Sequence, residues 1–448
     1  MSFIRKIFAA AAGICLMVTG LAGCASEEGE IIPNWFSSKE TIYFWYPDES
    51  MTEYINAAAV SFGADRNVRV IPTLVSDSAY LEAIYEATLH SDKMPDAYIL
   101  SHDQLEKAYL SGLAEEVRDG GGILTEKFSD AALNAVTYKG KKIAWPFYFD
   151  TTALICNRTY LQEWVSQQMN AASEDPGEME EEEEAVLDET RKERLLSDPS
   201  PLSLEDILFI SNTFDVPEGV EGVLKWDVSD IFYNYWVTGN YMNTGGETGD
   251  SVREIDLNNE NAAQCLAVYQ GLNQFFSIES DSVSYETVLE EFLSGKFVFT
   301  VATADAVEKI TKAREDGSFT YECTVLPMPD VSDALESRSM SVTGTVVVNG
   351  YSAHKELAEE FAAYLVSEYD ADLYERCWKL PACLDRKPQG EFFDAYYEEY
   401  AQSIPLPKMM KISNFWVELE ALFSRVWNGG NIEKELSLLA ENIGRQLE

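Results

Sequence analysis

The sequence holds only three histidines in 448 residues, and none of them lies in an H-E-x-x-H motif or in another metal-ligating spacing. A P-loop, a G-x-G-x-x-G turn and a G-x-S-x-G nucleophile elbow are also missing. The chain therefore carries no signature of a metalloprotease, a nucleotide-binding enzyme or a serine hydrolase, and we expect no metal or cofactor. A glycosidase needs only two well-placed carboxyl groups, so 77 acidic residues leave that class open.

Cysteine is scarce, and the seven cysteines form no C-x-x-C pair. Those that follow the N-terminal region are Cys156, Cys265, Cys323, Cys377 and Cys383. An odd number without paired spacing predicts neither a zinc site nor a disulfide framework. A bond between Cys377 and Cys383 stays open as an alternative.

Basic residues are few, because 33 Lys and Arg face 77 Asp and Glu, for a formal net charge of −44. This balance disfavours binding of nucleic acid or of an anionic membrane through a basic patch. Part of the acid lies in residues 171–201, where Glu180 to Glu184 are consecutive. Since blocks of like charge are solvated, we interpret this segment as an acidic surface insertion, partly helical. It lacks the alternating acids and central glycine of a calcium loop, which argues against calcium capture.

Long apolar runs are absent except near the N-terminus, where residues 7–21 follow two basic residues. This run has the length of a secretion-signal core and is short for a membrane span. It ends in "LAGC", which is similar to the lipobox of bacterial lipoproteins. We therefore predict a signal peptide over residues 1–23, a lipid on Cys24 and an acidic tether over residues 24–40. An ordinary signal peptide with a chance cysteine is the alternative.

The body of the chain begins with alternating strand and helix patterns. Strand patterns cover residues 41–47, 68–75 and 96–101, and helix patterns cover residues 51–65, 78–92 and 102–117. This alternation predicts an α/β fold with mostly parallel sheets flanked by helices. Ligands bind beyond the carboxyl ends of strands in such sheets, which draws attention to Tyr46, Asp48 and Asp103. His102 beside Asp103 is interpreted as a polar rim and not a catalytic pair, because neighbours at a strand end point apart.

The stretch "KGKKIAWPFYFDTTALICN", residues 139–157, is rich in aromatic residues and closes on a lone acid. Ile143, Trp145 and Phe147 fall on one face of a strand, which predicts that these side chains are buried. A carboxylate at the end of such a run must be solvated, paired or used, so Asp150 is a candidate functional residue.

Later segments continue the same pattern. The expected elements are a helix over residues 203–214 with Ser203 and Asp206 as a capping box, a helix that ends at Gly295, a strand over 297–302, a helix from Asp305, a strand over 343–350, a helix over 353–368 and two C-terminal helices around Gly429.

Five stretches, taken in order, resemble the extracellular solute-binding proteins of ABC importers, the large family typified by maltose-binding protein. They are "MPDAYILSHDQLEKAYLSGLAEEV", "YKGKKIAWPFYFDTTALICNRTYL", "LEEFLSGKFVFTVATADAVEKI", "CTVLPMPD" with "TGTVVVNGYSAHKELAEEFAAYLVSE", and "MMKISNFWVELEALFSRVWNGG". Together they span nearly the whole chain after the tether.

The resemblance implies a type II periplasmic-binding-protein-like fold, in which two hinge-connected α/β lobes hold a ligand in the cleft between them. Residues 41–149 and 328–370 would form lobe 1, and residues 150–327 and 371–448 would form lobe 2. Asp150 would then emerge at the first crossover between the lobes and face the cleft.

The resemblance also implies that cleft carboxylates bond to sugar hydroxyls while aromatic faces lie against the sugar ring. By position in the matching stretches, the candidate ligand-binding residues are Asp48, Asp103, Asp150, Tyr235 and Trp416, with Tyr46, Trp236 and Tyr241 as neighbours. Asp305 stands where sugar binders often carry a tryptophan, and Glu49 and Gln104 stand where the maltose-type pattern has basic residues. We therefore expect a more acidic cleft, suited to another oligosaccharide, an amino sugar or a cationic solute.

Structural roles stay open for most of these candidates. Trp416, Tyr235 and Trp236 fit a buried core equally well, Asp48 fits a turn, and Asp103 fits a helix cap.

The implied function is capture of a small solute, in the first place a carbohydrate, outside the cell membrane and its delivery to an ABC permease. The chain would act as a lipid-anchored monomer without enzymatic activity. Two other classes remain as alternatives: a surface lipoprotein that uses the same fold as a scaffold or sensor, and an envelope glycosidase.

Overall fold

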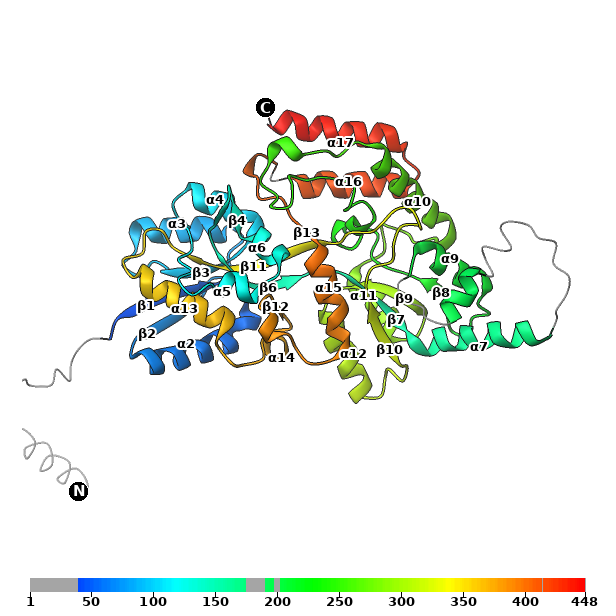
Figure 1. The fold of residues 1–448 in the computed structure, drawn as a ribbon, viewed down its shortest axis with the longest axis horizontal. Helices are drawn as coiled ribbons and strands as arrows, with labels where there is room; N and C mark the ends of the chain where they lie inside the picture. Colours follow the sequence, from blue (N-terminus) through cyan, green and yellow to red (C-terminus); the bar gives the residue numbers. More distant parts are fainter. Residues whose placement is uncertain (1–38, 175–189, 197–201, 413, 448) are drawn as a thin grey trace, which may run out of the picture. The chain divides into compact units, whose positions relative to one another are not determined.

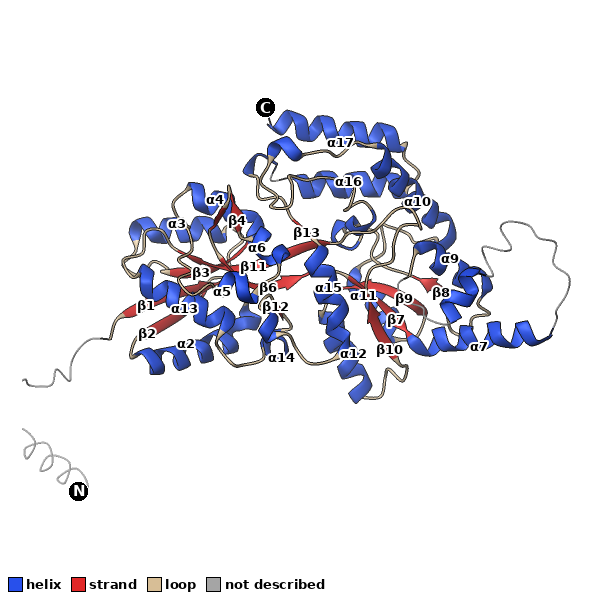
Figure 2. Ribbon diagram, viewed as in Figure 1, coloured by secondary structure: helices blue, strands red, loops and turns tan. Residues whose placement is uncertain are grey.

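The computed structural model describes residues 39–174, 190–196, 202–412 and 414–447. From residue 40 onward, the described part packs as one unit with two main β-sheets, a two-stranded hairpin and helices around them (Figure 1, Figure 2). The predicted signal peptide, Cys24 and most of the predicted acidic insertion lie outside the described residues.

The larger sheet has the strand order β12-β6-β11-β3-β1-β2, and β13 pairs with β11. Its strands are β1 (Thr41–Tyr46), β2 (Arg69–Leu74), β3 (Ala97–Ser101), β6 (Trp145–Asp150), β11 (Met340–Val348), β12 (Leu380–Pro381) and β13 (Ile404–Pro405). Around it lie α2 (Thr52–Arg66), α3 (Tyr80–His90), α4 (Leu105–Leu110), α5 (Ile123–Lys127), α6 (Asp130–Ala135), α13 (Lys355–Ser367), α14 (Leu373–Cys377) and a hairpin of β4 (Thr137–Tyr138) and β5 (Lys141–Lys142).

Strand β3 shows why the larger sheet needs helices on both faces. Its residues alternate between two separate hydrophobic clusters, with Ala97 and Ile99 in one and Tyr98 and Leu100 in the other. Helices α2 and α13 contribute to the first cluster, and α3 and α4 contribute to the second. Because side chains alternate along a strand, a strand that is apolar at every position must be covered from both sides.

The smaller sheet has the order β10-β7-β9-β8. Its strands are β7 (Ala153–Asn157), β8 (Gly222–Leu224), β9 (Phe297–Ala302) and β10 (Cys323–Leu326). The remaining helices are α7 (Arg158–Glu174), α9 (Leu204–Thr213), α10 (Glu260–Phe276), α11 (Tyr285–Leu293), α12 (Asp305–Glu315), α15 (Asp394–Gln402), α16 (Phe415–Trp427) and α17 (Ile432–Leu447), with short 3-10 helices at Glu49–Met51, Ile231–Tyr233 and Tyr235–Val237. We call the bodies built on the larger and smaller sheets lobe 1 and lobe 2.

Two crossover segments lie side by side between the lobes. β6 leads into β7 through Thr151 and Thr152, which are both buried. The hydroxyl of Thr151 donates a hydrogen bond to the carbonyl oxygen of Met340 (3.0 Å), where the returning chain enters β11. Asp150 and Val342 are paired in the β6–β11 ladder. The end of the aromatic strand therefore lies at the junction of the lobes.

The elements predicted from the sequence are largely present, but the sheets are mixed instead of mostly parallel. In the larger sheet β1 pairs in parallel with β2 and β3, whereas β11 runs antiparallel to β3 and β6. In the smaller sheet only the β8–β9 pair is parallel. The reason lies in the path of the chain. A strand that enters a sheet from a crossover runs in the opposite direction to the strands of the strand–helix–strand units in that sheet.

A second difference concerns the helix predicted over residues 102–117, because α4 ends at Leu110. Gly112 adopts a left-handed backbone conformation (φ +75°), and a Cβ there would lie 2.9 Å from the Tyr351 hydroxyl oxygen. A left-handed glycine after the last turn is a common helix terminator, and here it also makes room for a neighbouring ring.

The last segment of the chain contributes to both lobes. β12 and β13 pair with strands of the larger sheet, while α16 packs against α10 and α17. In the segment before β11, Asp330 exchanges backbone hydrogen bonds with Leu202 (3.0 Å) and Leu204 (2.8 Å) at the start of α9. The division of the chain at residues 149/150, 327/328 and 370/371 stays a prediction.

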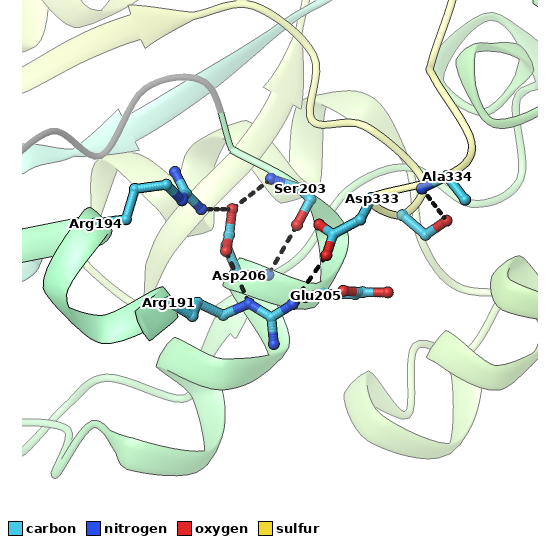
Figure 3. A network of polar contacts seen from close by, with 8 residues as sticks. Arg191, Arg194, Ser203, Glu205, Asp206, Asp333 and Ala334 are labelled. Carbon is cyan, nitrogen blue, oxygen red and sulfur yellow. Dashed lines mark hydrogen bonds and ion pairs between the residues drawn. The ribbon is translucent and has the colours of Figure 1, made fainter. Parts of the chain in front are cut away.

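The C-terminal part of the acidic insertion is fastened to lobe 2 by a polar cluster (Figure 3). Residues 190–196 are helical, and Arg191 and Arg194 both contact Asp206, the predicted capping-box residue of α9. Asp206 also accepts a hydrogen bond from the backbone N–H of Ser203 (2.8 Å), which confirms the predicted box. Its side chain is only 2% exposed. One carboxylate thus caps a helix and holds two arginines.

We expect Asp206→Ala to lower the free energy of unfolding by about 2–4 kcal/mol, because the substitution removes a helix cap and leaves two arginines without their buried partner. Glu205→Ala is the matched control. Glu205 contacts the same Arg191 (2.6 Å) but is 41% exposed, so its loss should cost less than about 1 kcal/mol. Urea unfolding of both variants measures the difference, and equal effects would contradict the role of Asp206.

Candidate functional site

A cavity of about 530 Å³ lies between the two lobes. From lobe 1 and the crossovers it is lined by Ser50, Asp150, Val342, Cys377, Trp378 and Lys379, and from lobe 2 by Phe232, Tyr233, Tyr285, Thr303 and Asp305. Several of these residues follow the carboxyl ends of strands: Ser50 follows β1, Asp150 ends β6, and Thr303 follows β9. This is the position at which open α/β sheets bind ligands.

A second cavity of about 590 Å³ beside β8 is slightly larger. All of its lining residues come from lobe 2, and it contains the ion pair of Lys225 and Glu291 (2.6 Å). We place the candidate site in the inter-lobe cavity, because both lobes contribute acids and aromatic rings to it, whereas lobe 2 alone lines the second cavity.

Aromatic rings form much of the lobe 2 wall. Tyr233 and Tyr285 are stacked, with ring centroids 4.8 Å apart and an angle of 14° between the planes. Phe232 meets Tyr233 edge-on at 5.8 Å. On the lobe 1 side, Trp378 is 38% exposed and contacts Tyr374 edge-on at 5.8 Å. Such rings offer rigid contact area for the C–H-rich face of a ligand.

Two carboxylates reach the same cavity from different elements. Asp150 has a side chain that is 34% exposed, and burial in the wall, with the charges of Asp305 and Asp48, raises its pKa against the opposing effect of Lys379. Asp305 accepts hydrogen bonds from the hydroxyls of Tyr285 (2.7 Å) and Thr303 (2.5 Å). The Tyr285 ring is therefore held in place by an acid of the same wall.

Lys379 is the cation of the cavity wall. Its ammonium nitrogen lies 3.8 Å from Asp48 Oδ2 and 3.9 Å from Asp150 Oδ2, and it sits over the ring of Tyr148 at 5.3 Å. Sequence reasoning did not find Lys379 or its neighbour Trp378. They follow α14, a helix of five residues, where no periodic pattern marks a site.

Of the residues predicted from the sequence, the structure brings Asp48, Asp150 and Asp305 together. Asp48 caps the 3-10 helix after β1 by accepting a hydrogen bond from the backbone N–H of Ser50 (2.9 Å). It also lies near Lys379 of the cavity wall. Tyr46 is buried and donates its hydroxyl hydrogen to Thr52 (3.2 Å).

The other predicted residues lie outside the cavity wall. Tyr235 and Trp236 are buried in the core of lobe 2, where their polar atoms donate to the carbonyl oxygens of Met242 and Tyr233 (3.0 Å each). Trp416 is half-buried, with its ring 6.2 Å from that of Phe232, and it is a neighbour of a lining residue and not part of the lining itself.

Asp103 lies at a different place, near the buried Lys408. Burial raises the pKa of the Asp103 carboxyl, and burial lowers the pKa of Lys408 to about 7. Lys408 donates to the carbonyl oxygen of Asn134 in α6 (3.1 Å) and to that of Thr248. His102 accepts a hydrogen bond from the backbone N–H of Thr343 at Nδ1 (3.0 Å) and is fully buried. These groups fasten lobe 1 to residues 404–412.

The thiol of Cys377 in the cavity wall and the imidazole of His102 outside it are not activated groups. The Cys377 thiol has a pKa raised to about 12 by burial, so it is protonated near neutral pH and is a poor nucleophile. His102 is bonded elsewhere and has a pKa lowered to about 3 by burial. In the described ranges, no cluster of three or more His, Cys, Asp or Glu side chains is arranged to hold a metal ion. Cys377 and Cys383 are both free thiols, so the disulfide left open from the sequence does not form.

Two α/β lobes joined by adjacent crossovers, with acids and aromatic rings converging between them, define the class of two-lobed binding proteins. The chain belongs to the bacterial extracellular solute-binding proteins, because the profile of that family matches residues 57–375. This confirms the resemblance seen in the sequence. Membership implies an extracytoplasmic location and a solute-binding role. Within the described ranges, every helix is too short or too polar to traverse a lipid bilayer.

Several solved structures share the fold of this chain. The extracellular solute-binding protein from Staphylococcus aureus in complex with maltose superposes with a TM-score of 0.72 at 17% identity, covering 91% of this chain and 98% of that one. A cyclo/maltodextrin-binding protein complexed with maltotetraose gives 0.71 at 16% identity, with 94% and 99% covered. The maltose-binding periplasmic protein from Listeria monocytogenes gives 0.68 at 17%, with 92% and 98% covered. A comparison with curated proteins gave no match. At these identities the structures establish the type II two-lobed fold.

Proposed function

We propose that the chain captures a sugar or short oligosaccharide in the inter-lobe cavity and delivers it to an ABC permease. The observation that carries the proposal is the composition of one cavity, in which the stacked rings of Tyr233 and Tyr285 and the carboxylates of Asp150 and Asp305 line the same space. A pyranose has polar edges and C–H-rich faces, so flat rings and hydrogen-bond acceptors are the groups that recognise it. Three similar structures hold maltose or maltotetraose, which supports a carbohydrate as the ligand of this chain.

In the proposed mechanism the ligand first contacts one lobe and the lobes then close around it. Thr151, Thr152 and the segment before Met340 would serve as the hinge, since they are the connections between the sheets. A ligand that bridges Asp150 on one side and the Tyr233–Tyr285 pair on the other stabilises the closed arrangement over the open one, which is all that a shift of population requires. The ligand itself is not changed chemically.

The proposal includes a lipid on Cys24 that holds the protein at the outer face of the cell membrane, followed by the tether of residues 24–40. Acyl chains on one residue anchor a protein without spanning the bilayer. ATP hydrolysis would belong to other subunits, in agreement with the absence of a P-loop from the sequence. We propose that the chain works as a monomer, with residues 41–149 and 328–370 in lobe 1 and residues 150–327 in lobe 2. Residues 371–448, predicted for lobe 2, are shared between the lobes, because β12 and β13 pair with strands of the larger sheet.

A thermal-shift screen tests the proposal. The purified chain is heated with glucose, maltose, maltotriose, cello- and xylo-oligosaccharides, amino sugars and their N-acetylated forms. A bound sugar raises the melting temperature by mass action, and a concentration one hundred times the dissociation constant stabilises by about 2.7 kcal/mol. Calorimetric titration of the best ligand should give one site per chain. If no carbohydrate shifts the melting transition, carbohydrate capture is refuted, and a scaffold or sensor role becomes the favoured function.

A further inference from the structure

The charges around the inter-lobe cavity do not balance. Three carboxylates, of Asp48, Asp150 and Asp305, lie in its wall or in contact with it, and two ammonium groups pair with or approach them. A third ammonium near the cavity, that of Lys312, already pairs with Glu308. Lys309 pairs with Asp305 Oδ2 at 2.9 Å, one turn along α12. This leaves Lys379 to serve both Asp48 and Asp150.

Lys379 does not form a close ion pair with either acid. Its nitrogen stands 3.8 Å and 3.9 Å from the two carboxylate oxygens, beyond hydrogen-bond length. Among the residues that the structure describes, no side chain or backbone N–H donates a hydrogen bond to the Asp150 carboxylate; its closest cation is Lys379. A buried or half-buried carboxylate without a donor is unusual, because desolvation of a charge costs free energy unless hydrogen bonds replace the lost water.

The aromatic rings of the same cavity already accommodate ammonium groups. The Lys309 nitrogen lies 5.1 Å from the ring centroid of Tyr285, and the Lys312 nitrogen lies 5.2 Å from that of Trp378. An ammonium within about 6 Å of a ring face is attracted by its quadrupole. Tyr285 is thus flanked by Lys309 and by the stacked ring of Tyr233, and these contacts show that aromatic rings of this wall accept an ammonium group beside them.

We propose that the ligand is an amino sugar or a short oligosaccharide of amino sugars, whose protonated amine bonds to Asp150 while its ring lies against the aromatic wall. This inference rests on the proposed function and names the substrate class of the same site. An ammonium supplies the donor that Asp150 lacks and offsets the excess negative charge. A neutral sugar hydroxyl supplies a donor but leaves the charge uncompensated.

Calorimetric titration with three probes of equal length tests the inference: a glucosamine trisaccharide, its fully N-acetylated form and maltotriose, at mildly acidic pH where the amines are protonated. We expect the glucosamine trisaccharide to bind at least about tenfold more tightly than its N-acetylated form, because acetylation removes the charge of the amine. Asp150→Asn should remove that preference, with a loss of about tenfold or more for the amine and little change for the acetylated probe.

Lys379→Met gives an independent readout in the opposite direction. Removing the competing cation leaves Asp48 and Asp150 free for the ligand, so the amine should bind several-fold more tightly, about a factor of three to ten. Asp281→Asn, at an exposed acid outside the cavity wall, controls for the change in net charge and should leave all three affinities unaltered.

The outcomes separate this inference from the proposed function. If maltotriose or the acetylated probe binds as tightly as the amine, and Lys379→Met weakens binding, the inference is overturned while sugar capture stands. If spermidine binds and none of the three sugars does, both fall.

Discussion

Replacing Trp378 by alanine is expected to weaken sugar binding about thirtyfold, because roughly 80 Å² of apolar contact at 25 cal/mol per Å² corresponds to about 2 kcal/mol. The indole is 38% exposed at the cavity and is the aromatic side chain that lobe 1 contributes to the wall lining. Titration of the best carbohydrate from the thermal-shift screen into the variant measures the loss.

The backbone of Trp378 separates this binding role from a structural one. Trp378 follows α14 in a left-handed conformation (φ 58°, ψ 23°), which costs a residue with a Cβ about 1–2 kcal/mol. Trp378→Gly should therefore be more stable to unfolding than Trp378→Ala by about 1 kcal/mol, because glycine adopts this conformation without strain. Both variants should bind equally weakly. Strained backbone positions cluster at ligand-binding sites, so the conformation of Trp378 agrees with the proposed ligand contact.

Phe275→Ala is a suitable control, because Phe275 is an exposed aromatic of lobe 2 that lines the other cavity. It should not change the affinity. If the Trp378 variants bind as the unmodified chain does, the indole makes no ligand contact and the aromatic recognition must come from the lobe 2 wall alone.

The contrast between Trp378 and β3 shows which parts of the molecule a sequence can predict. Strand β3 is a continuous apolar run and helix α13 carries an amphipathic pattern, because each buries its apolar side chains against neighbours. Asp150 was predicted because it interrupts such a pattern. Trp378 and Lys379 interrupt nothing, since they belong to a short connection whose position depends on where α14 packs.

The segment around Tyr235 shows a different limit. Residues 231–237 form two short 3-10 helices separated by Asn234, which accepts from Trp226 (2.8 Å) and donates to the carbonyl oxygens of Asp227 (2.9 Å) and Asp230 (2.6 Å). This buried amide sets the orientation of the rings on either side. Phe232 and Tyr233 consequently face the cavity, and Tyr235 and Trp236 enter the core. A run of aromatic residues in the sequence predicts that a wall is aromatic, but it does not predict which of the rings line the cavity.

Glu399 on α15 is a buried acid between the lobes. It bonds to a crossover segment, and its titration should make the free energy of unfolding depend on pH. Its carboxylate accepts hydrogen bonds from the backbone N–H of Met328 (2.9 Å) and the hydroxyl of Ser339 (2.5 Å), the two ends of the segment that returns to β11. Helix α15 contacts β7 and β10 of lobe 2 as well as α6 (Figure 1). One side chain thus fastens a crossover to a helix that touches both lobes.

Burial raises the pKa of Glu399 to about 7 from its ordinary 4.5, while these hydrogen bonds lower it in part. Between these two values the folded chain holds a proton that the unfolded chain has lost. The free energy of unfolding therefore falls as the pH rises through this window, by roughly 3 kcal/mol from this residue alone. The contribution is complete below the lower value and is lost above the upper one.

Glu399→Gln should remove this pH dependence, because the amide is uncharged throughout and keeps an oxygen acceptor for one of the two donors. In denaturant unfolding at a series of pH values, the free energy of unfolding of the variant should rise relative to that of the unmodified chain as the pH increases from acidic to neutral. Glu398→Gln, its exposed neighbour on α15, should follow the unmodified chain. Parallel curves for Glu399→Gln and the unmodified chain would mean that the carboxyl titrates normally, and then it could not hold Met328 and Ser339 from a dry position between the lobes. A diverging pair would instead show that Glu399 keeps its proton in the folded chain at mildly acidic pH, and that the burial of its charge near neutrality costs more than the hydrogen bonds of Met328 and Ser339 return.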